Sequence, residues 1–359
     1  MGHERLRAGI IGAGFIGAVH ARAVHTLGQD LGGVAASSPA RSREAAAALG
    51  ARAAFDTAEE LAAAPGIDVV HICTPNALHA PLTRIALDAG KHVVLEKPVG
   101  IGTAEIADLV RRWRDGDRVV AVPFAYRFYP VVREVRARVR DARIRLIHGV
   151  YLQDWLSCET DTNWRVDAAL GGPSRAFGDI GVHWCDLAEF VTGQRIARVH
   201  AILPRVVPQR AGTAVDTEDA ALLQFETEQG VFGSTVISQI SPGRRNQLQL
   251  RIDTADTEYA FDQQEPEILW MGRRDGTRVL HRGDPVLGPD ATSRNLVPAG
   301  HPQGYLDSFT GFIADAYAAV RGGRPDGLPT LADGARAAAI TEAVLDSARR
   351  RDWAEVTPG

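Results

Sequence analysis

An apolar run in residues 92–100, HVVLEKPVG, ends in Glu96, Lys97 and Pro98. A charged pair is not expected inside a buried strand, so Glu96 and Lys97 mark its end. Open α/β sheets bind ligands at the carboxyl ends of their strands, so a charged side chain at this place could meet a ligand. Pro98 restrains Lys97 to an extended backbone and can form a cis peptide. Lys97 is therefore the first candidate for chemistry, and a solvated strand end is the alternative.

The sequence GAGFIG at residues 12–17 follows the apolar run RAGII and opens a helical pattern. Its spacing is that of dinucleotide-binding loops. In such loops Gly12 makes the tight turn, Gly14 lets the backbone approach a pyrophosphate, and Gly17 allows close packing of helix and strand. The helix N-terminus then faces the anion. A plain glycine-rich turn is the alternative, and the predicted cofactor contacts are Gly12, Gly14, Phe15, Ile16 and Gly17.

The ribose of an NAD cofactor is usually held by an Asp or Glu about twenty residues beyond the glycine loop. Here Ser37 and Ser38 stand in that place, followed by Arg41. A missing carboxylate removes a charge that would repel a 2'-phosphate, and Arg41 can pair with one. The pattern favours NADP(H) over NAD(H), with Ser37, Ser38 and Arg41 as contacts. Alternatively, Ser38 is a helix N-cap and Arg41 a solvated residue of that helix.

The chain has 359 residues, 45% of them hydrophobic and 23% charged, which is enough for two domains of ordinary size. It lacks an apolar run near the roughly 18 residues that a membrane span requires, so no membrane partner is expected. A net charge of -4 without a basic block gives no footprint for nucleic acid. The N-terminus has no signal-peptide pattern, so a cytoplasmic location is expected. Cys73, Cys158 and Cys185 form no C-x-x-C pair; buried thiols are expected and no metal site is predicted.

Short apolar runs alternate with Ala-rich helical stretches up to about residue 125, which predicts a parallel sheet covered by helices on both faces. Beyond that point, strand-like runs are separated by turn residues, which indicates an antiparallel sheet. Two helical patterns close the chain, and residues 284–301 are expected to form a long surface loop. The expected fold is α/β, with an N-terminal Rossmann dinucleotide-binding domain at 1–125 and a C-terminal α+β domain with a large, mainly antiparallel sheet at 126–359.

Three further segments carry a family resemblance: 69–99 with TPN-x-x-H and EKP, 126–130 with YRFYP, and 177–193 with D-x-G-x-H. With the glycine loop they resemble the Gfo/Idh/MocA oxidoreductases, the family of glucose-fructose oxidoreductase and inositol 2-dehydrogenase. The resemblance spans nearly the whole chain. It implies a nicotinamide cofactor held by Thr74, Pro75, Asn76, His79, Glu96, Lys97 and Arg127. A surface salt bridge is the alternative for Arg127.

The resemblance also implies the catalytic residues, because the family's Lys, Asp and His match Lys97, Asp179 and His183. Oxidising a secondary alcohol removes a hydride from the carbon and a proton from the hydroxyl. The ordinary pKa of histidine is about 6.5, which suits removal of the hydroxyl proton, so His183 is the predicted general base. Asp179 would orient the imidazole, and Lys97 would stabilise the developing alkoxide. The alternatives are a packed histidine and a helix N-cap at Asp179.

Aromatic planes and polar donors between residues 151 and 165 suit a sugar or cyclitol substrate. Arg175 follows a Gly-Gly-Pro segment where the family often has three glycines, and its charge suggests an acidic or heavily hydroxylated substrate. Tyr151 and His301 are further candidates, and each tryptophan could equally belong to the core of the second sheet. The predicted substrate-binding residues are Lys97, Gln153, Trp155, Trp164, Arg165, Asp179, His183 and Tyr305.

The predicted function is an NAD(P)-dependent dehydrogenase or reductase that moves a hydride between the nicotinamide and a secondary alcohol or ketone of a sugar, inositol or related polyol. The alternative is a redox-assisted NAD-dependent glycosidase or lyase of the same family. A cofactor-sensing binding protein without turnover is a third interpretation. The resemblance further implies a homodimer or homotetramer, since an antiparallel sheet with one exposed face can pair with a copy of itself.

Overall fold

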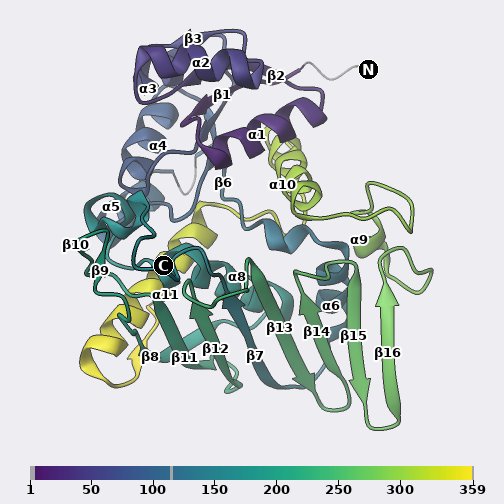
Figure 1. Cartoon of the computed structure of the whole chain (residues 1–359). Helices are drawn as coiled ribbons and strands as arrows, with labels where there is room; N and C mark the ends of the chain where they lie inside the picture. Colours follow the sequence, from purple (N-terminus) through teal and green to yellow (C-terminus); the bar gives the residue numbers. More distant parts are fainter. Residues whose placement is uncertain (1–4, 114–115, 358–359) are drawn as a thin grey trace. The chain divides into compact units, whose positions relative to one another are not determined.

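The computed structural model describes residues 5–113 and 116–357, and Figure 1 shows the course of the chain. The chain forms two compact units. The first contains the chain up to Ala125 together with Phe309–Ala335, and the second contains Tyr126–Ser308 and the chain from Arg336 onward. The sequence prediction placed Phe309–Ala335 in the second domain, and this assignment was wrong. A helical pattern reveals an apolar face but does not reveal which core covers that face.

The first unit holds a parallel sheet whose described strands run in the order β3-β2-β1-β4-β5-β6. This is the strand order of a Rossmann fold, so the predicted class is confirmed. Strand β4 is buried along its whole length, which is typical of a strand covered by helices on both faces. The elements are β1 Arg7–Ile11, α1 Phe15–Thr26, β2 Asp30–Ala35, α2 Pro39–Leu49, β3 Ala54–Phe55, α3 Ala58–Ala63, β4 Val69–Ile72, η1 Asn76–Leu78, α4 His79–Asp88, β5 His92–Leu95, α5 Thr103–Trp113 and β6 Val120–Ala121.

Helix α2 begins and ends at residues suited to those places. The Ser38 side chain accepts a hydrogen bond from the Arg41 amide, and Pro39 is the first helical residue. Gly50 ends the helix in the left-handed conformation, with φ 70°. Ser38 is thus a helix N-cap, as its alternative interpretation had it. These caps fix where Ser37 and Arg41 stand after β2.

The second unit is built on a sheet whose described strands run in the order β16-β15-β14-β13-β7-β12-β11-β8-β17. Among these strands only β7 and β12 pair in parallel, and the other neighbours are antiparallel. The predicted large, mainly antiparallel sheet is therefore confirmed. The strands are β7 Ile144–Leu152, β8 Ile196–Ile202, β11 Ala220–Thr227, β12 Phe232–Ser238, β13 Gln247–Thr254, β14 Glu258–Asp262, β15 Ile268–Arg273, β16 Gly276–His281 and β17 Ala354–Glu355.

Burial alternates along these strands, as expected for a sheet with one covered face. On β11, for example, Leu222 and Gln224 are exposed between buried neighbours. Helices α6 and α8 pack against strands β7, β13, β14 and β15, and Figure 1 shows them behind the sheet. The remaining elements are η2 Ala125–Phe128, α6 Pro130–Val139, η3 Trp164–Val166, α7 Ala168–Gly171, the π-helical turn η4 Phe177–Gly181, α8 Val182–Thr192, β9 Gln209–Arg210, β10 Thr213–Ala214, α9 Pro289–Thr292, α10 Tyr305–Val320 and α11 Leu331–Arg350.

Residues 284–301 are more ordered than the predicted surface loop, because they contain α9 and are held by Arg282. The Arg282 guanidinium donates to the carbonyls of Val297 and His301 at 2.9 and 2.6 Å. Cys158 is exposed, whereas Cys73 and Cys185 are buried as predicted. The described residues include no helix with both the length and the apolar character needed to cross a bilayer.

Candidate functional site

Three strands of the first unit end level with one another at one edge of its sheet. Ile11, Ile72 and Leu95 are register partners on β1, β4 and β5. The loops that follow carry the glycine motif, the TPN segment (Thr74-Pro75-Asn76) and the EKP segment (Glu96-Lys97-Pro98). In a sheet of this order the ligand lies beyond the strand ends, where the order reverses between β1 and β4. The register therefore brings the predicted cofactor residues of the first unit to one place.

The three motif glycines have different surroundings. Gly12 has φ 97°, and a Cβ there would lie 2.4 Å from the Cys73 carbonyl oxygen. A Cβ at Gly17 would lie 2.1 Å from the Gly12 carbonyl oxygen, but one at Gly14 would meet no heavy atom within 4 Å. Helix α1 has no acidic residue in its first turn. Gly12 and Gly17 are thus needed for the packing of the loop itself, and Gly14 leaves room beside a helix N-terminus that attracts anions.

The residues after β2 carry hydroxyl and guanidinium groups. Ser37 and Arg41 are exposed, and Arg41 Nη1 donates to Ser37 Oγ at 3.3 Å. The chain has no acidic residue between β2 and Glu44. Ser38 Oγ is engaged as the cap of α2, so of the two serines Ser37 is the better placed to meet a ribose.

His79, predicted to contact the cofactor, instead joins the TPN and EKP segments. Its ring is fully buried, with Nδ1 2.6 Å from the Pro98 carbonyl oxygen and Nε2 2.8 Å from that of Thr74. Burial lowers the pKa of His79, although both carbonyl contacts favour its charged form. The Lys97-Pro98 peptide is cis. His79 is therefore a support for the two loops rather than a cofactor ligand.

Glu96 also faces the interior instead of the predicted cofactor. Its side chain is buried, with Oε1 3.0 Å from His20 Nε2, and Oε2 accepts the Lys97 amide at 3.3 Å. Burial would raise the pKa of Glu96, but the His20 hydrogen bond and favourable electrostatic interactions with His20, Lys97 and His79 together lower it. The half-buried residues that stay at the edge of this unit are Ile16, Thr74, Pro75, Asn76 and Lys97, while Phe15 is 81% exposed.

A closed set of hydrogen bonds joins Tyr126, Tyr151 and Asn246 in the second unit. Tyr151 Oη donates to Asn246 Oδ1 at 2.9 Å, so the 2.6 Å contact between the two phenols places the donor on Tyr126. Asn246 Nδ2 in turn donates to Tyr126 Oη at 3.4 Å. Burial raises the pKa of Tyr126 and raises that of Tyr151 well above its usual value. Both phenols therefore remain protonated at neutral pH.

Predicted substrate residues extend outward from this set. Gln153 Nε2 donates to Asn246 Oδ1 at 2.8 Å, and Trp155 Nε1 donates to Gln153 Oε1 at 2.8 Å. The Tyr126 ring meets His183 edge-on with centroids 5.3 Å apart, and the Tyr305 ring lies 6.5 Å away. Gln153, Trp155, His183 and Tyr305 are all half-buried. The structure thus gathers these residues around Tyr126.

Asp179 lies within η4, four residues before His183, so it is not the helix N-cap of its alternative interpretation. Its Oδ1 accepts from Arg165 Nε at 3.3 Å and its Oδ2 from Gln239 Nε2 at 2.8 Å. The Arg165 guanidinium stacks 4.4 Å from the Trp164 ring centroid. Asp179, Arg165 and Trp164 therefore form a second group of half-buried predicted residues. His301, by contrast, is exposed. The orientation of His183 by Asp179 stays a prediction.

Arg127 does not face solvent and has a partner within the second unit. Its Nε donates to Asp186 Oδ2 at 2.8 Å, its Nη2 contacts Asp186 Oδ1, and its guanidinium lies 4.9 Å from the Phe190 ring centroid. The side chains of Arg127 and Asp186 are 9% and 7% exposed. The pair ties the turn that carries Tyr126 to the helix that carries His183. The ion pair is therefore buried and not the surface salt bridge considered as the alternative, while the cofactor contact of Arg127 stays a prediction.

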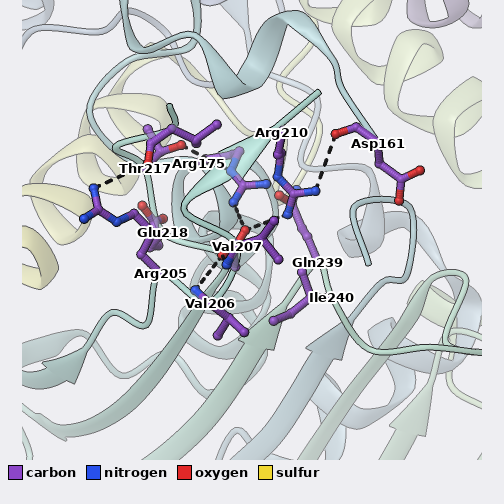
Figure 2. A network of polar contacts seen from close by, with 12 residues as sticks. Asp161, Arg175, Arg205, Val206, Val207, Arg210, Thr217, Glu218, Gln239 and Ile240 are labelled. Atoms are coloured by element: carbon purple, nitrogen blue, oxygen red, sulfur yellow. Dashed lines mark hydrogen bonds and ion pairs between the residues drawn. The ribbon is translucent and has the colours of Figure 1, made fainter. Parts of the chain in front are cut away.

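Arg175, suggested by the sequence as a reader of acidic substrates, is fully buried against Asp219 (Figure 2). Arg210 Nη2 donates to Asp219 Oδ1 at 2.8 Å, and the amides of Val206 and Val207 donate to Oδ2 at 2.7 and 2.8 Å. Burial would raise the pKa of Asp219, but the Val207 amide and the two guanidinium groups outweigh it and lower the pKa. Arg175 is thus part of a structural network and has no access to substrate.

The network continues into the turn that carries Asp179. Glu218 Oε1 accepts from Ser174 Oγ at 2.8 Å and from the Phe177 amide at 2.9 Å. Ser174 Oγ also accepts from the Gly178 amide at 3.0 Å. Burial raises the pKa of Glu218. Residues 217–219 therefore hold the first turn of η4, which places Asp179 beside Gln239.

Tyr126, Gln239 and Asn246 were not among the residues predicted from the sequence. Tyr126 stands beside Arg127 in the YRFYP segment, whose arginine drew attention first. Gln239 follows β12 directly, and Asn246 immediately precedes β13. A polar amide next to an alternating strand is the signal that could have found them, but such amides are common in turns.

Comparisons with known proteins extend over nearly the whole chain. A family model described as "Oxidoreductase family, NAD-binding Rossmann fold" matches residues 6–124, and one described as "GFO/IDH/MocA C-terminal domain" matches residues 132–256. A levoglucosan dehydrogenase of Pseudarthrobacter phenanthrenivorans is 27% identical over 98% of each chain. A levoglucosan dehydrogenase solved with NADH and levoglucosan is 27% identical with a TM-score of 0.91, covering 99% of this chain and 100% of that one. An inositol dehydrogenase homolog of Azotobacter vinelandii, solved with NADH and myo-inositol, is 28% identical with a TM-score of 0.86 over 98% of both chains.

The Asp219 network predicts a large stability change for Asp219→Asn. The substitution leaves Arg175 and Arg210 buried without their anion, so we expect the free energy of unfolding to fall by about 3–5 kcal/mol in urea denaturation. Asp216→Asn is the matched control, since Asp216 pairs with Arg205 at the surface with its own side chain 89% exposed. That variant should differ from wild type by less than about 1 kcal/mol.

The pH dependence follows from the lowered pKa of Asp219. A carboxyl group whose pKa is lower in the folded state stabilises the fold above its unfolded pKa, which is about 3.9 for Asp. This stabilisation is lost as the pH falls through the folded pKa. The difference between wild type and Asp219→Asn should therefore be constant near neutrality and shrink below about pH 4. Equal stabilities at neutral pH would contradict the role of the network.

Proposed function

Because the chain belongs to the Gfo/Idh/MocA family of oxidoreductases, we propose that it is a nicotinamide-dependent dehydrogenase of a polyol. The reaction moves a hydride between the cofactor and a secondary hydroxyl, or the corresponding ketone, of a sugar, inositol or related compound. The relatives solved with NADH and either levoglucosan or myo-inositol support this substrate class. A cytoplasmic location and the absence of a nucleic-acid partner remain predictions of the sequence.

The observation that carries the proposal is the set of polar aromatic groups around His183 in the second unit. Tyr126 packs against the imidazole, and its hydroxyl is hydrogen-bonded to Tyr151 and Asn246. Gln153 and Trp155 continue the set toward half-buried positions. Hydroxyl and amide groups beside aromatic planes suit a compound that presents hydroxyls on an apolar ring.

The residues at the strand ends of the first unit fit a dinucleotide. The open space at Gly14 and the N-terminus of α1, without an acidic residue in its first turn, suit a pyrophosphate. The TPN segment and Lys97 stand at neighbouring strand ends, where they would border the nicotinamide. When bound, the nicotinamide supplies the hydride acceptor for alcohol oxidation and the donor for the reverse direction.

The side chains have separate tasks in this proposal. His183 takes the hydroxyl proton as the carbon–oxygen double bond forms and the hydride leaves the carbon. Lys97 stabilises the negative charge that develops on the substrate oxygen. Asp179, held by Arg165 and Gln239 in the turn before the helix of His183, orients the imidazole and favours its charged form.

For the cofactor we propose a modest preference for NADP(H) over NAD(H). Ser37 and Arg41 are exposed after β2, in contact with each other and without a carboxylate beside them in the sequence. A guanidinium here suits a 2'-phosphate, whereas a carboxylate would repel it. The two relatives solved with NADH favour the opposite preference, so the choice depends on the Arg41 guanidinium.

We also propose that two copies associate through the open face of the large sheet, as a homodimer or within a homotetramer. Ile202, Leu222, Val236 and Val150 are successive register partners across β8, β11, β12 and β7. The first three are 58%, 42% and 39% exposed. A row of apolar side chains on an uncovered sheet face is typical of an interface between copies.

The function is tested by assaying the protein against levoglucosan, myo-inositol and a panel of sugars with NAD and NADP in parallel. We expect reduced cofactor and ketone to form in equal amounts. His183→Asn should lower kcat by about 10²–10⁴-fold, because the proton acceptor is lost. His281→Asn, which changes an exposed histidine of the same unit, should leave kcat unchanged. Cofactor binding without reduction across the panel would refute the proposal, and release of an aglycone without net reduction would favour a redox-assisted glycosidase or lyase.

The cofactor preference is tested with Ser37→Asp. A carboxylate at this position repels a 2'-phosphate and can accept the ribose 2'-hydroxyl, so kcat/KM for NADP should fall about tenfold or more while that for NAD is kept or improved. Arg41→Ala should lower kcat/KM for NADP alone. Equal effects of both variants on the two cofactors would contradict the proposed role of these residues.

The interface is tested by measuring mass with multi-angle light scattering. We expect wild type to be a dimer or tetramer and Val236→Glu to shift the population toward monomers, since a charge inside an apolar interface is unfavourable. Val286→Glu is the matched control, because Val286 is an exposed valine outside the sheet. A monomeric wild type, or the same mass for Val236→Glu, would rule out this interface.

A further inference from the structure

Four buried side chains form a continuous row behind the EKP segment. His20 Nε2 lies 3.0 Å from Glu96 Oε1, His20 Nδ1 lies 2.8 Å from His71 Nδ1, and His71 Nε2 lies 2.8 Å from Tyr317 Oη. His20 and His71 are fully buried, and Tyr317 and Glu96 are 1% and 7% exposed. The row joins α1, β4, α10 and the segment directly after β5 inside the first unit. It is too well buried to serve as a ligand site and lies next to the proposed catalytic lysine.

The donor and acceptor groups of these side chains fix the direction of the hydrogen bonds along the row. A carboxylate only accepts, so the proton of neutral His20 is on Nε2 and its Nδ1 must accept. His71 therefore donates from Nδ1, and its Nε2 accepts the Tyr317 hydroxyl proton. Burial lowers the pKa of His71 well below its usual value and raises that of Tyr317, so both keep these protonation states at neutral pH.

The opposite direction is unfavourable because of Tyr317. If His20 were doubly protonated, its Nδ1 would donate to His71, which would then donate from Nε2 to the phenol oxygen. The phenol proton would then need its own acceptor, yet within the described part of the chain the Tyr317 hydroxyl bonds only to His71. An unsatisfied buried donor is costly. The row therefore runs from the Tyr317 hydroxyl to the Glu96 carboxylate.

Glu96 connects the row of hydrogen bonds to the neighbouring lysine. Its second oxygen, Oε2, accepts the Lys97 amide at 3.3 Å. The titratable groups that interact with Glu96 are His20, Lys97, His79 and the buried thiol of Cys73. His79 in turn contacts the Pro98 and Thr74 carbonyls of the EKP and TPN segments. The His20 ring also packs edge-on against Phe309, with centroids 4.8 Å apart, and Glu96 itself is only 7% exposed. The carboxylate is thus fixed by His20 on one side and fixes Lys97 on the other.

We propose that Tyr317, His71 and His20 form a hydrogen-bond relay of fixed direction that keeps Glu96 as a carboxylate, and that Glu96 is the positioning residue for Lys97. The inference rests on the proposed function, since it gives Lys97 a task in alcohol oxidation. The relay makes the role of Lys97 in catalysis depend on His20, a buried histidine of helix α1, which follows the glycine loop. The His20 ring therefore connects the phosphate-binding helix with the EKP segment.

The relay itself is tested without turnover by two-bond ¹H–¹⁵N correlation spectra of protein labelled in its histidines. We expect His20 as the neutral Nε2–H tautomer and His71 as the neutral Nδ1–H tautomer at pH 7, with signals assigned through His20→Leu and Tyr317→Phe. The Nδ1–H form is the rarer one in water and is expected here only because His20 accepts from it. A charged His20, or His71 in the Nε2–H form, would overturn the direction of the relay.

The effect on Lys97 is tested by the pH dependence of kcat. His20→Leu removes the donor of Glu96 at nearly constant volume, and losing one charge-assisted hydrogen bond shifts the carboxyl equilibrium by about ten- to a hundredfold. A carboxyl with a raised pKa becomes protonated at a higher pH. The acid-side decrease of kcat in this variant should therefore occur at a pH one to two units higher than in wild type, and kcat should recover at high pH. Glu96→Gln should give a low kcat at every pH, and His20→Gln, which keeps a donor, should restore part of the profile.

His25→Leu is the matched control, because His25 lies on the same helix but is exposed, with its Nε2 2.8 Å from the Leu49 carbonyl oxygen. It should keep the wild-type profile. A His20→Leu profile that is merely lower at every pH would mean a structural role only and would overturn the proposal for Lys97. If wild type turned over no substrate, the proposed function would fail. The tautomer spectra, and a ¹³C titration of the Glu96 carboxyl in wild type and His20→Leu, would still test the relay.

Discussion

The register that keeps Ile11, Ile72 and Leu95 side by side is the constraint on which the first unit depends. Parallel strands end in the same direction, so a shared register brings their following loops to one edge whatever their distance along the chain. Close contacts then fix the loops to one another, as Gly12 against the Cys73 carbonyl and the His79 ring between two carbonyls demonstrate. The positions of the proposed cofactor groups follow from backbone pairing more than from any single side chain.

Both units use buried carboxylates to organise distant segments. An ionised carboxylate without partners is very costly in the interior, so each one gathers donors from several parts of the chain. Asp219 draws two arginines and two amides into one network, and this network holds the turn that carries Asp179. Glu96 takes a histidine from α1 and the amide of Lys97. In each unit a buried acid thus belongs to a network that supports a segment with a proposed catalytic residue.

The parts of the fold that the sequence predicted are those with local causes. Alternating burial, glycine spacing and caps such as Ser38 act over a few residues, so the Rossmann order and the large sheet could be expected. The partners of charged side chains could not, because they depend on folding: Arg175 and Asp219 are 44 residues apart, and Tyr151 and Asn246 are 95 apart. A charge in the sequence does not reveal whether solvent, a ligand or another side chain will balance it. For this reason the sequence did not predict the buried partners of Arg175, His79 and Glu96. The unit that Phe309–Ala335 joins was also missed.

The fixed direction of the row from Tyr317 to Glu96 has a consequence for how this sequence can change over time. Within the row each histidine donates one hydrogen bond and accepts one, while Tyr317 only donates and Glu96 only accepts. A replacement that reverses a role at one position therefore leaves two donors or two acceptors facing each other. A glutamine in place of Glu96, for example, has only one acceptor oxygen for two donors, the His20 Nε2–H and the Lys97 amide. Its NH₂ group would then face one of these donors. Single substitutions in the row are therefore penalised, and neutral drift must proceed by paired exchanges. We therefore expect the four positions, which lie on three elements and the segment after β5, to change together.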